Sequence, residues 1–189
     1  MIAGEAGGRR LTVPDGRHTR PTSDRAREGL FATVSSSAGP LVGSRVLDLY
    51  AGSGAVGIEA LSRGAEHVLL VESAGPALRV IRANIEAIGL PGAVVAGDRV
   101  ERCLARGPDC DRYDIVFADP PYAMPAADVT EVLNMLTEHG WLAPGALVVI
   151  ERATRSGELT WPPGYVPDRA RKYGEGTFWY GLAPRGQMQ

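Results

Sequence analysis

The chain has 189 residues, of which 44% are hydrophobic and 22% charged, and its formal net charge is −2. This length and composition are typical of one compact globular domain and argue against a disordered or fibrous protein. A membrane protein is not expected, because no apolar run approaches the ~18 residues of a membrane span. A secreted protein is not expected either, because the N-terminus lacks the apolar segment of a secretory signal. Cys103 and Cys110 do not have the spacing of a zinc site or of a disulfide framework.

The first predicted unit is an arginine-rich N-terminal extension, residues 1–20. From Arg9 to Arg27 six arginines stand against two acids, a local excess of positive charge in a chain whose net charge is negative. Such a segment is either a solvated arm or a surface that contacts phosphates. The alternating sequence RRLTV, residues 9–13, is compatible with a strand, so we expect a hairpin or a flexible arm here.

A helix is predicted next, over residues 20–34. Pro21 disfavours helix at the residue before it, Thr22 or Ser23 can cap the helix, and Asp24 lies where the helix dipole favours an acid. This helix opens the second predicted unit, a single catalytic domain that covers residues 21–189.

Strand and helix patterns then alternate to the end of the chain. Strands are predicted at 45–51, 67–73, 93–98, 113–122 and 145–152, helices at 55–64, 76–90, 100–106 and 127–140, and a hairpin at 168–183 that turns around residues 174–176. Short apolar strands between amphipathic helices indicate an α/β fold. We expect a Rossmann-like, mostly parallel seven-stranded sheet, with an antiparallel C-terminal hairpin and helices on both faces.

The sequence GSGAVG, from Gly52 to Gly57, lies between the first of these strands and a helix and fits the GxGxxG pattern of cofactor loops. Gly52 and Gly54 let the backbone turn and approach a ligand, and Gly57 permits tight helix packing. Asp48 lies four residues before Gly52, inside the strand. A pyrophosphate would be repelled by this carboxylate, whereas the sulfonium and ammonium groups of S-adenosylmethionine would be attracted. The loop therefore favours S-adenosylmethionine over a nicotinamide.

Two further acids end the second and third strands. Glu72 lies twenty residues after Gly52, where an acid suits bidentate hydrogen bonding to ribose hydroxyls in either class of cofactor site. Asp98 is placed to accept from the adenine amine, to cap the following helix, or to do both. Because the carboxyl ends of parallel strands share one edge, these acids predict a single site.

The reaction site is predicted at Ala-Asp-Pro-Pro-Tyr, which follows the fourth strand. Pro-Pro is often only a turn, but this strand is expected beside the cofactor crevice. The rigid Pro120 and Pro121 would hold the Asp119 carboxylate and the Pro120 carbonyl as fixed acceptors for an exocyclic amine, and Tyr122 can stack on its base. This combination indicates methyl transfer to a base amine.

The chain is similar to class I S-adenosylmethionine-dependent methyltransferases, and more narrowly it resembles the RsmD family. The resemblance rests on segments that span nearly the whole chain: residues 7–34, 46–65, 119–122 and 169–174. Its most specific piece is Arg-Pro-Thr-x-Asp-Arg, residues 20–25, whereas Asp-Pro-Pro-Tyr is shared with adenine-N6 enzymes.

The resemblance implies methylation of the N2 amine of a guanine in 16S ribosomal RNA or an assembling small subunit, by a monomeric cytoplasmic protein. It implies a cofactor site at Asp48, Tyr50, Gly52, Gly54, Glu72, Ser73 and Asp98, and a guanine site at Asp119, Pro120, Pro121 and Tyr122. The implied RNA-contacting residues are Arg9, Arg10, Arg17, Arg20, Arg171 and Lys172. No metal ligand is implied.

Three other functions compete with this interpretation. An adenine-N6 DNA methyltransferase would use the same chemistry but usually needs a target-recognition domain, for which this chain has no room. A nicotinamide oxidoreductase conflicts with Asp48 and with the lack of a separate substrate domain. A non-catalytic RNA-binding module with a degenerate site conflicts with the complete set of acids.

Overall fold

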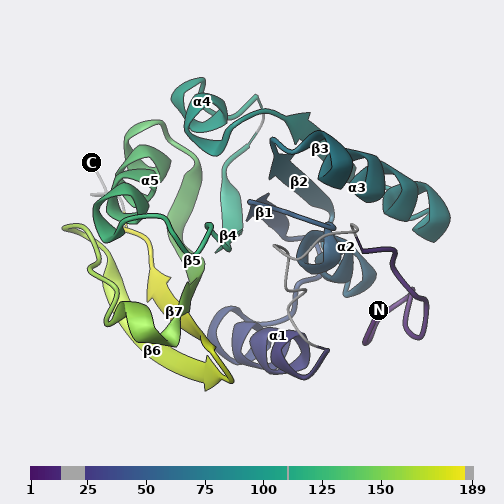
Figure 1. Ribbon diagram of the computed structural model, residues 1–189, viewed down its shortest axis with the longest axis horizontal. Coiled ribbons are helices and arrows are strands. Elements are labelled where there is room, and N and C mark those ends of the chain that lie inside the picture. The colour runs from purple at the N-terminus through teal and green to yellow at the C-terminus, as the bar shows by residue number, and fades with distance from the viewer. Residues whose placement is uncertain (14–23, 110, 186–189) are drawn as a thin grey trace.

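The computed structural model describes residues 1–13, 24–109 and 111–185. One sheet of seven strands has the order β3-β2-β1-β4-β5-β7-β6 (Figure 1). The first five strands are parallel, and β7 and β6 pair antiparallel at one side. The strands are β1 (Arg45–Leu49), β2 (His67–Glu72), β3 (Ala93–Gly97), β4 (Tyr113–Ala118), β5 (Leu142–Ala153), β6 (Val166–Tyr173) and β7 (Gly176–Leu182). The predicted Rossmann-like sheet with its C-terminal hairpin is confirmed.

Helices cover both faces of this sheet. They are α1 (Asp24–Ala38), α2 (Ala55–Ser62), α3 (Gly75–Ile88), α4 (Val100–Ala105) and α5 (Ala126–Glu138), with a short 3-10 turn η1 (Thr154–Ser156). Figure 1 shows α4 and α5 on one side of the strands and α1, α2 and α3 on the other. Each side has its own cluster of buried apolar residues. The alternating sequence pattern therefore produces two cores on a shared sheet.

Some element boundaries differ from the prediction. Helix α1 continues to Ala38, and β5 begins at Leu142 rather than Gly145. Of the predicted features of the first helix, Pro21, Thr22 and Ser23 lie outside the described residues. Gly89 ends α3 with a φ of 69°, a left-handed conformation in which its N–H donates to the Ile85 carbonyl.

The predicted strand at residues 9–13 is not observed. The backbone of Thr12 instead pairs with the amide side chain of Asn84 on α3: the Thr12 N–H donates to Asn84 Oδ1 at 2.8 Å, and Asn84 Nδ2 donates to the Thr12 carbonyl at 2.9 Å. Since a side chain supplies these hydrogen bonds, the alternating pattern of the segment needs no neighbouring strand.

The N-terminus is anchored on α2 by a buried acid. The Glu59 side chain is fully buried and accepts from the Ile2 and Ala3 N–H groups at 2.9 and 3.0 Å and from Arg63 Nε at 2.9 Å. Ala6 is also buried, against an apolar cluster that includes Ile58. The first residues therefore belong to the packed domain.

A Glu59→Ala variant is expected to lose roughly 2–4 kcal/mol of unfolding free energy, because two backbone donors and a guanidinium lose a buried acceptor. Urea denaturation followed by circular dichroism measures the change. Glu66→Ala, at an exposed position, is the matched control and should stay within about 0.5 kcal/mol of the wild type. Equal stability of the two variants would contradict the anchoring role.

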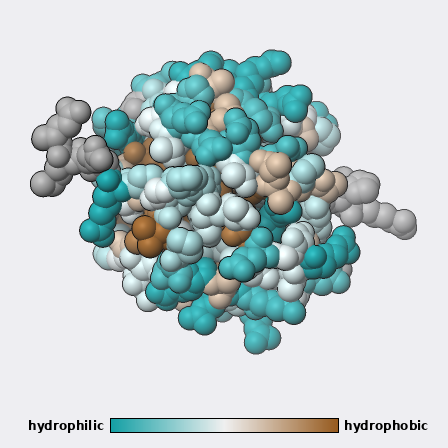
Figure 2. All heavy atoms as spheres, turned by 90° about the vertical axis from the view of Figure 1, so that its left-hand side faces the viewer, coloured by the Kyte–Doolittle hydropathy of each residue, from teal (hydrophilic) through white to brown (hydrophobic). Residues whose placement is uncertain are grey.

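No helix within the described ranges is long and apolar enough to cross a membrane. Figure 2 shows one face of the molecule, on which hydrophilic residues dominate and hydrophobic residues form only small separate spots. Scattered exposed apolar residues of this kind are usual for a protein in water. That face therefore offers no large apolar surface.

Candidate active site

A cavity of about 760 Å³ opens at the carboxyl ends of the parallel strands. It lies where the strand order reverses between β1 and β4, the position at which open α/β sheets bind ligands. Its volume is typical of a small-molecule site. The cavity brings together residues from the ends of five strands, among them Tyr50, Glu72, Asp98, Asp119 and Glu151. The predicted acids Asp48, Glu72, Asp98 and Asp119 therefore all line one cavity.

The glycine loop follows β1 and forms one wall of the cavity. Gly52 and Gly54 have φ angles of 57° and 76°, and Tyr50 is the one non-glycine residue with positive φ among the described residues. A Cβ atom on Gly57 would lie 2.9 Å from Val68 Cγ1 and 3.0 Å from Asp48 Oδ2. Gly57 thus permits close packing of α2 on the sheet, as its place in the loop predicts.

Asp48 stabilises this loop from below. Its side chain is buried, and Oδ2 accepts a hydrogen bond of 2.8 Å from the Gly57 N–H. Burial raises the pKa of Asp48 to about 7, the hydrogen bond from Gly57 opposes that rise, and the charge of Glu72 adds to it. Burial makes the ionised form of this carboxyl unfavourable, and a cationic ligand beside it would stabilise that form.

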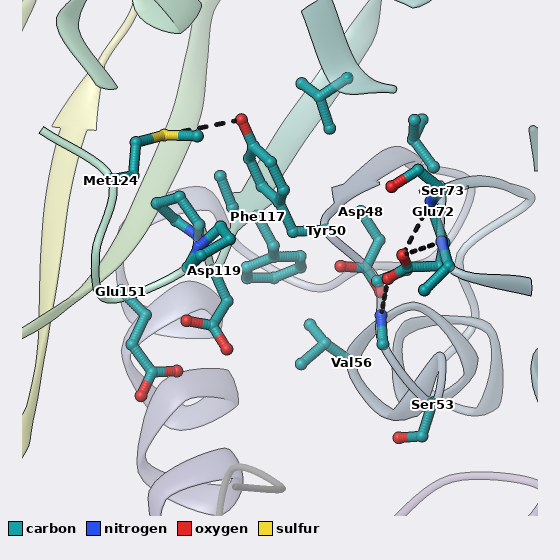
Figure 3. Close-up of a pocket in the computed structure, with 18 of the residues that line it drawn as sticks. Asp48, Tyr50, Ser53, Val56, Glu72, Ser73, Phe117, Asp119, Met124 and Glu151 are labelled. Carbon is teal, nitrogen blue, oxygen red and sulfur yellow. Dashed lines mark hydrogen bonds between the residues drawn. The ribbon is translucent and has the colours of Figure 1, made fainter. Parts of the chain in front are cut away.

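Glu72 holds the turns on either side of it. Its Oε2 accepts from the Gly52 N–H at 2.9 Å, and its Oε1 accepts from the Ser73 and Ala74 N–H groups at 2.7 and 2.8 Å (Figure 3). A carboxylate offers about four acceptor positions, so these three bonds leave one. The bidentate ribose contact that the sequence suggests is therefore reduced to a single open position on Oε2.

Asp98 is held by Arg102 of α4 and by Arg106, which directly follows that helix. Arg106 Nη1 donates to Asp98 Oδ2 at 2.7 Å, and Arg102 lies 3.7 Å from Oδ1. The hydrogen bond from Arg106 is the main reason why the pKa of Asp98 is lowered. The expectation that Asp98 caps α4 is wrong, because Arg99 occupies the cap position and no side chain caps the helix. Asp98 still lines the cavity.

The Asp-Pro-Pro-Tyr segment forms the opposite wall. The Asp119 N–H donates to the Leu49 carbonyl of β1 at 3.4 Å, and the Met124 N–H donates to the Pro121 carbonyl at 2.8 Å. Solvent in the cavity reaches Asp119, yet the surrounding walls displace enough water to raise its pKa well above the usual range, and the charges of Glu151 and Asp48 raise it further. Tyr122 is 43% exposed at the rim.

Sequence reasoning missed several residues of this wall. Glu151 of β5 lies beside Asp119, at the end of the cavity opposite Glu72 and Ser73 (Figure 3). The register places it there, because Ala118 pairs with Ile150 and each acid is the next residue of its strand. A lone acid after the apolar run of β5 was the available signal. Elsewhere in the cavity lining, the prediction also missed the polar residues Ser53, Arg99 and Glu101 and the apolar residues Leu30, Val56, Phe117, Met124, Val149 and Phe178.

The predicted RNA-contacting residues do not line the cavity where they are described. Arg171 and Lys172 are exposed on the edge strand β6. Arg9 and Arg10 are exposed beside α3, where Arg9 Nη1 donates to the Ile88 carbonyl at 2.8 Å. The two remaining residues, Arg17 and Arg20, lie outside the described residues.

A protein-family model described as "Conserved hypothetical protein 95" matches residues 1–181. The chain is 35% identical over 175 residues to the ribosomal RNA small subunit methyltransferase D of Escherichia coli, covering 93% of this chain and 85% of that protein. It is 34% identical to a putative rRNA methyltransferase, YlbH, of Bacillus subtilis, over 80% of each chain.

Solved structures give the same relationship. A putative methyltransferase, yhhF, from Escherichia coli superposes with a TM-score of 0.84 at 33% identity, covering 98% of this chain and 97% of that one. A putative methylase from Haemophilus influenzae, HI0767, has a TM-score of 0.79 at 27% identity, covering 97% of each chain.

Proposed function

This chain belongs to the RsmD family of methyltransferases, and from that premise we propose that it methylates the N2 amine of a guanine in small-subunit ribosomal RNA, with S-adenosylmethionine as methyl donor. The observation that carries the proposal is the single cavity in which a glycine loop faces Asp119-Pro-Pro-Tyr. A cofactor loop and an acceptor for a planar amine within one cavity fit methyl transfer to a base.

The residues of the glycine-loop wall fit the cofactor. Gly52 lines the cavity and leaves its backbone open to a ligand, whereas Gly54 is buried beneath the turn and supports it. Glu72 keeps one acceptor position for a ribose hydroxyl, and the buried Asp48 carboxyl suits a cationic group. Tyr50 and Ser73 line the same cavity, and Asp98, which also lines it, is proposed to accept from the adenine amine. The cofactor, when bound, supplies a methyl group on a sulfonium.

The opposite wall orients the guanine. The Asp119 carboxylate and the Pro120 carbonyl accept the two hydrogens of the N2 amine, Pro121 keeps this turn rigid, and Tyr122 at the rim stacks on the ring. These contacts direct the nitrogen lone pair at the methyl group. The N2–methyl bond forms as the methyl–sulfur bond breaks, with its electron pair left on sulfur, and Asp119 takes one of the amine hydrogens as a proton. Burial raises the pKa of Asp119, so its ionised form is a stronger base than an ordinary carboxylate.

The RNA is proposed to bind along two basic segments, the N-terminal residues 1–20 and the edge strand β6. Arg171 and Lys172 present exposed cationic groups on β6. The β6–β7 turn adjoins the cavity, because Gly176 pairs with Ala153 at the carboxyl end of β5. RNA phosphates bound by these cations would position the RNA strand so that its target base can reach Asp119.

Replacing Arg171 and Lys172 together with alanine should weaken RNA binding and lower the slope of log K against log salt by roughly 1 per residue. Filter binding with small-subunit RNA from 50 to 300 mM salt, about the range over which such contacts are screened, measures the slope. Arg82→Ala, an exposed arginine of α3, is the control and should keep the wild-type slope. An unchanged slope in the double variant would show that Arg171 and Lys172 of β6 do not contact the RNA phosphates.

The function itself is tested with radiolabelled S-adenosylmethionine and three separate substrates: naked ribosomal RNA, small ribosomal subunits and DNA. Nuclease digestion and mass spectrometry then identify the modified base. Label on guanine N2 of the small-subunit RNA is the expected result. Label on adenine N6, or on DNA alone, would overturn the proposal.

A further inference from the structure

Beyond the residues that line the cavity, we propose that Arg152 is a positioning residue for methyl transfer. It holds the turn that carries Tyr122, and so sets where the Tyr122 ring stacks on the target base. The inference rests on the proposed function and adds to it a residue that does not itself touch the base. It follows from a buried guanidinium that is bonded to the end of that turn.

The sheet places Arg152 behind the Asp-Pro-Pro-Tyr segment. In the parallel pairing of β4 and β5, Ile150 is level with Ala118, the last residue before that segment. Side chains alternate along a strand, so Arg152 faces the same side as Ile150 and Val148, which belong to the core cluster that includes α5. Only 7% of Arg152 is exposed, and it is not among the residues that line the cavity.

Tyr122 lies in a tight turn that is held at its last residue, Met124. The Met124 N–H donates to the Pro121 carbonyl at 2.8 Å, which closes a four-residue β-turn with Tyr122 as its second residue. Arg152 Nη2 donates to the Met124 carbonyl at 3.3 Å. The Tyr50 hydroxyl, from the residue after β1, donates to Met124 Sδ at 3.9 Å (Figure 3). Contacts from two strands therefore fix the turn, and with it the base of the Tyr122 side chain.

The hydrogen bond from Arg152 is one that α5 does not supply. The helix N–H groups of Asp128 and Val129 donate to the Pro125 carbonyl, so the Met124 carbonyl lies just outside the helix ladder. None of the ion pairs among the described residues includes Arg152. A buried cation without an ion pair is costly, and an apolar side chain here would extend the surrounding core. The bond to the turn is therefore the contact that a guanidinium adds at this position.

The test compares two replacements of Arg152. Arg152→Met keeps a long apolar stem but cannot donate, whereas the ammonium of Arg152→Lys can. Single-turnover rates on small subunits are divided by the concentration of cofactor-binding protein, which calorimetric titration with S-adenosylmethionine gives, so partial unfolding does not affect them. Arg152→Met should be slower by ~10-fold or more, and Arg152→Lys should recover most of this loss. Arg155→Met, at an exposed position, should keep the wild-type rate.

A double-mutant cycle with Tyr122→Ala shows whether Arg152 acts through the turn. Without the Tyr122 ring there is nothing to position, so adding Arg152→Met should then slow methylation by only ~3-fold or less. An equal loss in both backgrounds, or a rate of Arg152→Lys no higher than that of Arg152→Met, would overturn this inference alone. Absence of guanine-N2 methylation by the wild type would instead overturn the proposed function.

Discussion

An Asp119→Ala variant is expected to lose methyl transfer by about 10³-fold or more while it binds S-adenosylmethionine nearly as well as the wild type. Asp119 lies on the cavity wall formed by the Asp-Pro-Pro-Tyr segment, opposite the glycine loop. Its side chain makes no hydrogen bond to that loop in the described structure. Its backbone N–H, which alanine keeps, makes the contact to β1. Single-turnover methylation of small subunits and calorimetric titration with S-adenosylmethionine measure the two effects.

Asp119→Asn is the matched control for this experiment. The amide oxygen of asparagine can still accept one hydrogen bond from the N2 amine, but the side chain cannot take up a proton. We expect a rate between those of the wild type and Asp119→Ala, with cofactor affinity unchanged. Normal turnover by Asp119→Ala would show that the amine is oriented elsewhere, and a parallel loss of cofactor binding would make Asp119 part of the cofactor wall.

The second large effect is expected at Asp48, whose replacement by asparagine should weaken S-adenosylmethionine binding by ~10–100-fold. Asparagine can still accept from the Gly57 N–H, so the loop contact persists while the negative charge is lost. Calorimetric titration at pH 8 measures the affinity. Asp109→Asn, at an exposed position, should bind as the wild type does. Wild-type affinity in Asp48→Asn would show that this charge does not face the cofactor.

The pH dependence of binding separates this charge from a purely structural effect. The pKa of Asp48 in the free protein is raised to about 7, and a bound cation favours its ionised form. Below that pH binding must release a proton, so wild-type affinity should rise with pH, by up to about tenfold for each unit, and level off above pH 7. Asp48→Asn should lack this rise.

The raised pKa of Asp48 also affects the stability of the protein, which should fall with rising pH, whereas the affinity for S-adenosylmethionine should increase. Because the pKa of Asp48 is higher in the folded protein than its ordinary 3.8, the folded state binds more protons than the unfolded state between pH 4 and 7. The contribution of Asp48 to the unfolding free energy therefore falls as the pH rises through that range. S-adenosylmethionine should reduce this loss by stabilising the ionised carboxyl.

Most helices and strands were predicted correctly from local sequence patterns, because the contacts between elements favour the same secondary structure as the local sequence does. Each predicted strand between residues 45 and 152 has an observed counterpart, because apolar runs bounded by glycine leave few alternatives. The convergence of Asp48, Glu72 and Asp98 also follows from the sequence, since carboxyl ends of parallel strands share one edge.

The features that escaped prediction depend on which elements lie side by side. In the sequence Glu151 is only a lone acid after an apolar run, and it comes beside Asp119 only through the register of β4 and β5. The buried acceptor at Glu59 is far in sequence from the Ile2 and Ala3 donors that it satisfies. The role of Asp98 changed because Arg106, eight residues away, reaches it across α4. Composition and spacing carry no record of such pairings.

The position of β6 at the edge of the sheet has a consequence for the protein in concentrated solution. An edge strand carries unpaired backbone groups that can pair with another molecule and begin aggregation. Here the exposed Arg171 and Lys172 stand on that edge, so two copies meeting strand to strand would bring like charges together. The cations proposed to hold RNA would thus also protect the free enzyme from self-association, and their replacement should lower its solubility as well as its affinity.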